Sequence, residues 1–156
     1  MAELLARDIM TRKVITIGKD ATVSELVRRL LRYKISGVPI VNEKNELIGI
    51  VSEEDIIIKI SSLPFPISFS YAFLDNFESY TKSTKEFMET RVEDIMSKKI
   101  KTAGENMTLS KVVNIMINNN INRIPIVDEK NKLTGIITRA DVMSSMIKKA
   151  EKNKNS

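Results

Sequence analysis

The pattern of hydrophobic and polar positions along this chain occurs twice. Residues 8–55 align with residues 94–141 without a gap, and most apolar positions coincide along the two stretches. The clearest correspondence is between VPIVNEKNELIGIVS (38–52) and IPIVDEKNKLTGIIT (124–138). Two copies are too few for a solenoid, in which several repeats stack into one continuous core. We therefore predict two related units that pack face to face about a pseudo-twofold axis.

Each copy begins with the pattern of a short strand followed by an amphipathic helix. The apolar, β-branched run at residues 14–17 predicts the strand. Apolar residues at helical spacing predict the helix, and Thr22 precedes them in the first copy. We expect Arg28, Arg29 and Arg32 to lie on its opposite, solvated face. The apolar positions are Val23, Leu26, Val27, Leu30 and Leu31 in the first copy, and Leu109, Val112, Val113, Met116 and Ile117 in the second.

A hairpin and a second helix complete each copy. Proline donates no hydrogen bond, so we expect Pro39 and Pro125 to lie at edge-like or bulged positions. Residues 42–45 and 128–131 predict the hairpin turns. The resulting β-α-β-β-α unit has about 50 residues and is too small to be stable alone, so the fold class is α+β with paired units. In the closing helix, the residues expected to face inward are Ile56, Ile57 and Ile60, and in the second copy Val142, Met143, Met146 and Ile147.

A hydroxyl and an acid recur where the last strand of each copy gives way to a helix. The two segments are GIVSEED (49–55) and GIITRAD (135–141). As a structural feature, Ser52 with Asp55 and Thr138 with Asp141 form capping boxes, in which the hydroxyl and the acid satisfy free helix amides. As a functional feature, a helix N-terminus attracts phosphate, and a carboxylate can accept hydrogen bonds from both hydroxyls of a ribose. The two interpretations are compatible.

Composition narrows the possible functions. The 156 residues contain no cysteine and no histidine, which excludes disulfides, thiolate nucleophiles and imidazole bases. Without these, and without a phosphate-binding glycine loop or a metal-binding cluster, we expect no catalytic site and no metal site. The formal net charge of +5 comes partly from the C-terminal KKAEKNKNS and attracts anions only mildly. We do not expect nucleic-acid binding, because no basic stripe is interleaved with exposed aromatics. No long apolar run predicts a membrane segment or a signal peptide, so we expect a cytoplasmic protein.

The order DIM(T/S), a threonine-ending strand, a helix, (V/I)PIV and GI(V/I)(S/T)xxD resembles the cystathionine β-synthase (CBS) domain. Two such domains in tandem resemble a Bateman module, and the resemblance covers residues 6–62 and 92–150. It implies clefts between two CBS units that bind adenosine-type ligands, such as AMP, ADP, ATP or S-adenosylmethionine, with no obligatory cofactor. It also implies a regulatory homodimer that acts on another protein, whose identity the sequence does not give.

The resemblance transfers specific roles to residues of both copies. Asp55 and Asp141 match the ribose-binding acid, and Ser52 and Thr138 match the hydroxyl near the phosphate or ribose. In the family, backbone groups beside a strand threonine bind the edge of the adenine, and here these groups belong to residues 14–17 and 100–103. An apolar residue followed by proline packs against the base. These further positions are Thr16 and Thr102 for the strand, and Val38, Pro39, Ile124 and Pro125 for the apolar-proline step.

The two copies differ in charge near this site. Arg123 matches a position that often contacts phosphate in the family, and the resemblance implies that it can serve the Asp55 cleft. Its counterpart in the first copy is Gly37. We expect Arg139 to serve the Asp141 cleft, whereas Glu53 and Glu54 replace Arg139 and Ala140 in the first copy and would repel a triphosphate. Surface solvation is the competing interpretation for both arginines. The two sites are therefore expected to be unequal.

The sequence divides into a first CBS unit (1–62), an aromatic-rich linker (63–91), a second CBS unit (92–150) and a flexible basic tail (151–156). The linker contains all five phenylalanines of the chain. We expect an extended start and a helix over residues 73–89, covering the seam between the units or forming a partner surface. Two functions compete with ligand sensing: a structural dimerisation or partner-docking module without ligand, and a weak nucleic-acid binder.

Overall fold

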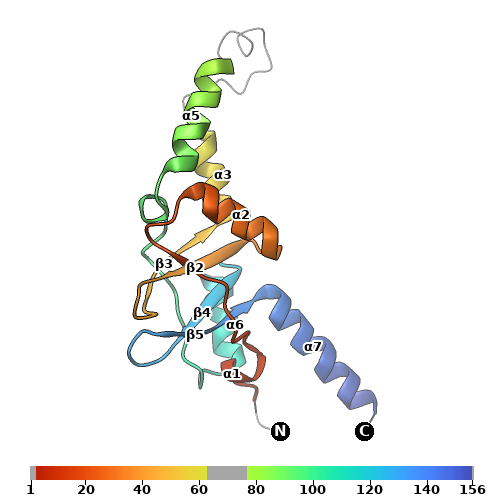
Figure 1. Cartoon of the computed structure of the whole chain (residues 1–156). Helices are drawn as coiled ribbons and strands as arrows, with labels where there is room; N and C mark the ends of the chain where they lie inside the picture. The colour runs from red at the N-terminus through yellow and green to blue at the C-terminus, as the bar shows by residue number, and fades with distance from the viewer. Residues whose placement is uncertain (1–2, 63–76, 156) are drawn as a thin grey trace. The chain divides into compact units, whose positions relative to one another are not determined.

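The computed structural model describes residues 3–62 and 77–155 of an α+β protein (Figure 1). By its internal contacts the chain forms two compact units. The terminal unit consists of Met1–Ile15, Glu43–Leu47 and Lys99–Ser156. The central unit consists of Thr16–Asn42 and Ile48–Lys98. These boundaries differ from those of the sequence repeats, because each repeat contributes its first segment to the unit that holds most of the other repeat.

Each unit contains one hairpin with helices around it. The elements of the central unit are β1 (Ile17–Gly18), α2 (Val23–Tyr33), β2 (Gly37–Val41), β3 (Leu47–Ser52), α3 (Glu53–Ser61), α5 (Phe77–Glu89) and the short 3-10 helix η1 (Val92–Asp94). Leu47, the first residue of β3, is counted with the terminal unit. The elements of the terminal unit are α1 (Ala6–Ile9), α6 (Leu109–Asn118), β4 (Arg123–Val127), β5 (Leu133–Thr138) and α7 (Arg139–Lys154).

The exchanged segments are the two copies of the DIM motif. Thr11 pairs with Ile136 on the free edge of β5, and Ser97 pairs with Ile50 of β3 in the same way. The terminal unit's core shows the same exchange, because Ala6 and Met10 belong to a buried cluster with residues of the second repeat. That cluster also contains Ala103, Val112, Met116, Ile124, Ile126 and Ile137.

A methionine of each DIM motif packs directly on a strand glycine. At Gly49 in β3, an added Cβ would lie 2.9 Å from Cγ of Met96 and closer still to its sulfur. At Gly135 in β5, an added Cβ would likewise lie 2.9 Å from Cγ of Met10. Glycine is therefore needed at both positions for space, since neither has a positive φ. These contacts explain why both copies have glycine at the first position of the GI(V/I) pattern.

The sheets correct two predictions about strands. The strand expected at 14–17 is shorter and later: β1 covers only Ile17–Gly18 and pairs in parallel with Ile40 and Val41. β2 is the central strand of its sheet, whereas we expected Pro39 to lie on an edge strand, so this prediction is wrong. Pro39 is tolerated because β1 begins opposite Ile40, one residue further along.

The second proline fits the prediction more closely. Pro125 lies opposite Ile136 in the antiparallel pair of β4 and β5, and the register shifts between Ile126 and Val127. Ile136 turns its own N–H and C=O toward Thr11, so it needs no hydrogen bond from Pro125. The irregularity expected at this proline is thus found one residue later in the strand.

The helices confirm the amphipathic pattern only in part. Val23, Leu26 and Leu30 of α2 are buried, and Thr22 caps the helix by accepting a hydrogen bond from the Glu25 N–H at 3.2 Å. Leu31 and its counterpart Ile117 in α6 are exposed, because they lie at the margin of the apolar stripe. The N-terminus of α6 differs from that of α2, since its Thr108 makes no side-chain cap.

The prediction for the closing helices is wrong at four positions. Ile56 is buried and Ile60 and Val142 are partly buried, as expected. Each of these helices is in contact with its unit along a narrow face only, and neighbouring apolar residues therefore remain at the surface. The exposed residues that were expected to face inward are Ile57, Met143, Met146 and Ile147.

The two hairpin turns hydrogen-bond to each other within the terminal unit. The Asn45 side-chain amide donates to the Leu133 carbonyl and the Asn131 side-chain amide donates to the Leu47 carbonyl, both at 2.9 Å. The Leu47 N–H donates to the Asn131 carbonyl and the Leu133 N–H to the Asn45 carbonyl, both at 3.0 Å. Asn45 and Asn131 have φ values of 62° and 61°, a left-handed conformation that asparagine tolerates better than most residues.

Residues 63–76 of the aromatic linker lie outside the described residues, including the extended start and the Phe65, Phe69 and Phe73 positions. Its described part, α5, begins at Phe77, within the helix expected over residues 73–89, and Phe87 is buried. Residues 151–154, expected to form a flexible tail, are the last turn of α7, which runs to the C-terminal end in Figure 1. In the part of the chain that the structure describes, no helix combines the length and the apolar character needed to span a bilayer.

Candidate functional site

The hydroxyl and acid of each copy meet at a strand-to-helix corner. At the end of β3, Asp55 Oδ2 accepts hydrogen bonds from the Ser52 N–H at 2.8 Å and from the Ser52 hydroxyl at 2.9 Å. At the end of β5, Asp141 Oδ2 accepts the same bonds from Thr138, also at 2.8 and 2.9 Å. The predicted capping boxes are therefore confirmed.

The capping box leaves part of each carboxylate unused. Both bonds within each box end on Oδ2, so Oδ1 of Asp55 and of Asp141 lies outside the box. Both aspartates are only partly buried. A partly buried carboxylate that is held rigidly through one oxygen can offer its other oxygen to a ligand hydroxyl without reorganising.

Protein oxygens occupy most of the helix amides at these corners. The Glu53 N–H donates to the Ser36 carbonyl at 2.8 Å, and the equivalent Arg139 N–H donates to the Asn122 carbonyl at 3.0 Å. The third amide of each helix donates to the hydroxyl of Ser52 or Thr138. Two of the first three amides are thus already paired, so these helix N-termini are weaker phosphate sites than the sequence motif suggests.

The two corners differ in charge, as expected from the sequence. The first turn of α3 carries the exposed Glu53 and Glu54 in addition to Asp55. The first turn of α7 carries the exposed Arg139 and a single acid, Asp141. The central unit's corner therefore disfavours an anionic group, and the terminal unit's corner tolerates one.

Arg123 lies beside the hydroxyl of its own unit. It is the first residue of β4, is partly buried, and is paired in register with Thr138 of β5. Residues directly opposite each other in an antiparallel pair project from the same face of the sheet. Strand pairing and the capping box together therefore bring Arg123, Thr138 and Asp141 to one end of the hairpin. The use of Arg123 by the Asp55 site stays a prediction.

Arg29 is a residue of the site region that the sequence analysis assigned to solvent. Its guanidinium Nη1 donates a hydrogen bond to the carbonyl oxygen of Thr16, one of the two strand threonines. The counterpart of Arg29 in the second copy is Ile115, which packs against the terminal unit's buried cluster. The presence of arginine in one helix and isoleucine at the equivalent position of the other could have indicated that Arg29 has a specific contact.

The remaining predicted residues fall into two groups. Thr16 and Thr102 are partly buried. Thr16 directly precedes Ile17 of β1, and Thr102 directly precedes Ala103, which pairs in parallel with Ile126. The apolar-proline steps are buried completely and contribute to the cores. Their contact with a base therefore stays a prediction. The four buried residues are Val38, Pro39, Ile124 and Pro125.

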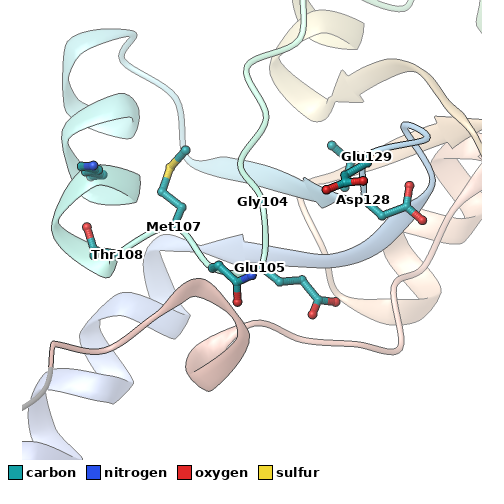
Figure 2. A pocket seen from close by; sticks show the side chains of 9 residues that line it. Gly104, Glu105, Met107, Thr108, Asp128 and Glu129 are labelled. Carbon is teal, nitrogen blue, oxygen red and sulfur yellow. The ribbon is translucent and has the colours of Figure 1, made fainter.

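A separate pocket of about 570 Å³ opens in the terminal unit, at the far end of β4 from Arg123 (Figure 2). None of the predicted site residues lines it. Two of its three acids have structural partners: Glu105 forms an ion pair with Arg12 at 3.7 Å, and Asp128 Oδ1 accepts the N–H groups of Lys130 and Lys132 at 2.9 Å. The pocket is lined by Gly104, Glu105, Asn106, Met107, Thr108, Lys111, Val127, Asp128 and Glu129.

The duplicated hairpin, helix and capped corner define a protein built from two copies of one small domain. The CBS domain family matches residues 6–62 and 92–148. These two matches span most of the chain, which therefore belongs to the CBS domain family as a tandem pair.

Two sequence relatives come from the archaeon Methanocaldococcus jannaschii. The uncharacterized protein MJ1426 is 33% identical over 155 residues, which cover 92% of this chain and 92% of that protein. The inosine-5'-monophosphate dehydrogenase of the same organism is 30% identical over 138 residues, which cover 88% of this chain but 23% of the enzyme. The chain thus spans less than a quarter of that enzyme's length.

Two solved structures share the fold. The CBS domain pair of protein MJ0100, in complex with 5'-methylthioadenosine and S-adenosyl-L-methionine, matches with a TM-score of 0.75 at 24% identity, over 95% of this chain and 99% of that one. CBSX2 in complex with AMP matches with a TM-score of 0.72 at 20% identity, over 92% of this chain and 96% of that one.

Proposed function

We propose that this protein is a regulatory module that senses an adenosine-type ligand. The observation that carries the proposal is the duplicated corner, where a carboxylate is fixed through Oδ2 by a hydroxyl and a backbone amide and keeps Oδ1 for a ligand. A ribose supplies two adjacent hydroxyl donors that suit such an acceptor. The ligands of the two structural neighbours, an S-adenosyl compound with methylthioadenosine and AMP, share this adenosine group.

Each proposed ligand contact has a chemical reason. Asp55 and Asp141 accept the ribose hydroxyls, while Ser52 and Thr138 donate their single hydroxyl hydrogen to these carboxylates and hold them in place beside the ligand. The backbone beside the strand threonines supplies donors and acceptors for the adenine edge. The apolar-proline steps support the base, and the two arginines attract phosphate. The remaining residues with these roles are Thr16, Thr102, Val38, Pro39, Ile124, Pro125, Arg123 and Arg139.

The output of such a module passes through another protein. We propose that the chain forms a homodimer in the cytoplasm, has no catalytic activity and changes the behaviour of a regulated partner when the ligand binds. Supporting this, the relative that is an enzyme extends far beyond the region that this chain matches. A docking module without ligand is the main alternative. Mass spectrometry of small molecules released from the purified protein tests the proposal, and a thermal-shift screen with adenosine compounds supplements it.

Replacing Asp55 or Asp141 by alanine should weaken adenosine binding at one site only. Loss of the bonds to the ribose diol should cost about 1–3 kcal/mol of binding free energy. Loss of the capping box should separately lower the unfolding free energy by about 1 kcal/mol. Titration calorimetry measures the first effect and thermal unfolding the second.

Glu25→Ala is the matched control for the aspartate variants. It removes the same type of capping bond, between the Thr22 N–H and Glu25 at 2.8 Å, at the N-terminus of α2, where neither residue is among the proposed ligand contacts. It should lower stability by a similar amount and leave ligand binding unchanged. Aspartate variants that lose stability but bind adenosine normally would reduce these residues to a capping role.

Arg123→Ala should penalise phosphorylated ligands and spare adenosine itself. A charge-assisted hydrogen bond to phosphate is lost, worth about 1.5–3 kcal/mol if the contact excludes water. The measurement is titration calorimetry with adenosine, AMP and ATP on the wild type and the variant. Gly37, the counterpart in the first repeat, offers the converse test, because Gly37→Arg adds the missing charge. An equal loss of affinity for all three ligands would instead indicate a folding role for Arg123.

A further inference from the structure

Arg29 of α2 is tied to the backbone that the proposed function assigns to the base of the ligand. Its guanidinium Nη1 donates a hydrogen bond to the Thr16 carbonyl, so the side chain reaches from the helix to the segment that leads into β1. Both residues belong to the central unit. Because the backbone beside Thr16 is assigned to the edge of a purine, this contact puts a cationic group beside the base.

The guanidinium of Arg29 has hydrogen-bond donors to offer a ligand. A guanidinium carries five N–H groups in a planar fork, and the bond to Thr16 uses one of them. Arg29 is exposed, and it takes part in none of the ion pairs formed among the described residues. Thr16 itself is only partly buried. This edge of the central unit therefore presents N–H donors next to a carbonyl that already has a partner.

The equivalent edge of the terminal unit has a different character. Ile115 corresponds to Arg29, and Thr102 corresponds to Thr16. An isoleucine side chain has no donor, and Ile115 packs against the buried cluster of its unit. The Thr102 carbonyl therefore receives no hydrogen bond from this position of the helix. A backbone carbonyl without such a bond can accept one from an amino group of a ligand.

Purines differ in hydrogen-bonding character at the edge that these groups would meet. Adenine has an amino donor at position 6, whereas guanine and hypoxanthine have a carbonyl acceptor there, beside the acceptor N7. Arginine donates two parallel hydrogen bonds to O6 and N7 of a 6-oxopurine, which is the commonest specific contact in the recognition of DNA bases. Opposite adenine, the same guanidinium would set N–H groups against the amino group. A backbone carbonyl has the reverse preference.

We propose that Arg29 makes the site beside Thr16 selective for a 6-oxopurine nucleoside or nucleotide, while the site beside Thr102 takes adenosine-type ligands. The inference rests on the purine sites proposed above and names a different base for one of them. The guanidinium donates to O6 and N7 of the base, and its bond to the Thr16 carbonyl holds the planar fork in place. The module then responds to two classes of purine and does not sense one ligand twice.

Adenosine and inosine differ only around position 6 and carry no phosphate, so titration calorimetry with both isolates the contact to the base. The wild type should bind inosine at one site per chain about tenfold more tightly than it binds adenosine there, the usual discrimination by a bidentate arginine. Arg29→Ile, which copies the second repeat, should abolish this preference and leave the other site unchanged. Arg28→Ile is the matched control, because it removes a neighbouring exposed arginine of the same helix and should keep the preference.

The outcomes separate this inference from the proposed function. A wild type that prefers adenosine to inosine at both sites would overturn the inference and leave adenosine sensing intact. A wild type that binds neither nucleoside would overturn both. An equal loss of affinity for inosine and adenosine in Arg29→Ile would reduce Arg29 to a structural contact and overturn its role in selectivity. Circular dichroism checks folding. If Arg29→Ile does not fold, Arg29→Lys keeps the charge without the planar fork and should lower the preference for inosine at least threefold.

Discussion

Replacing Gly135 by alanine should lower the free energy of unfolding by about 1–3 kcal/mol, the usual cost of forcing an extra methyl group into a packed site. The added Cβ would lie 2.9 Å from Cγ of Met10 and closer to its sulfur. Met10 is itself buried and cannot swing into solvent without leaving the terminal unit's core. Gly49→Ala should behave in the same way against Met96. Chemical denaturation with urea measures both effects.

Gly104→Ala and Gly18→Ala are matched controls for these substitutions. No atom lies within 4 Å of the Cβ that would be added at either glycine, and neither has a positive φ. Both controls should be close to neutral or slightly stabilising, because alanine restricts the unfolded chain more than glycine does. The pair Gly135→Ala and Met10→Ala should be non-additive, since the second substitution removes the clash that the first creates. Additive effects would contradict a direct contact.

Replacing Asn131 by alanine should lower the unfolding free energy by about 2 kcal/mol. About half of this comes from the left-handed conformation at φ 61°, which alanine adopts at a cost, and half from the lost bond to the Leu47 carbonyl at 2.9 Å. Asn45→Ala should cost a similar amount, because Asn45 makes the reciprocal bond to the Leu133 carbonyl. Thermal unfolding followed by circular dichroism provides the measurement.

Glycine at the same positions separates the two contributions. Asn131→Gly keeps the left-handed conformation accessible and removes only the side-chain bond, so it should cost about half as much as Asn131→Ala. Asn106 serves as a comparison in which a side-chain hydrogen bond, accepted from the Arg7 guanidinium, is lost without any change at a left-handed residue. If alanine and glycine at position 131 destabilise equally, the backbone conformation contributes nothing and the side-chain bond carries the whole effect.

The repeat allowed the main helices and the hairpin of each copy to be predicted from the chain alone. Identical spacing in two copies constrains each assignment twice, and the helix, hairpin and second helix all appear where the pattern places them. The capping boxes were also readable, because hydroxyl and acid three residues apart interact locally and need no tertiary contact. The same locality explains why Ser52 with Asp55 and Thr138 with Asp141 were identified as the centres of the candidate sites.

Burial on the second helices was not readable from spacing. The stripe containing Met143, Met146 and Ile147 is amphipathic, but the pattern records only where apolar residues lie, not what covers them. In the structure α7 meets its unit through a different, narrower face, on which Ser145 is buried. The contact of Arg29 could not be predicted for a related reason. Its bond to the Thr16 carbonyl joins α2 to the segment before β1, whereas helical spacing describes positions within one helix only.

The sequence by itself determined the two-copy organisation, the order of elements, the capped corners and the charge difference between them, since all of these depend on neighbouring residues. Only the tertiary structure decided that each DIM segment joins the unit of the opposite repeat, where Met10 packs on Gly135 and Met96 on Gly49. An alignment of repeats compares residues that share ancestry, whereas packing joins surfaces that fit. A gap-free repeat therefore carries no information about which copy completes which core.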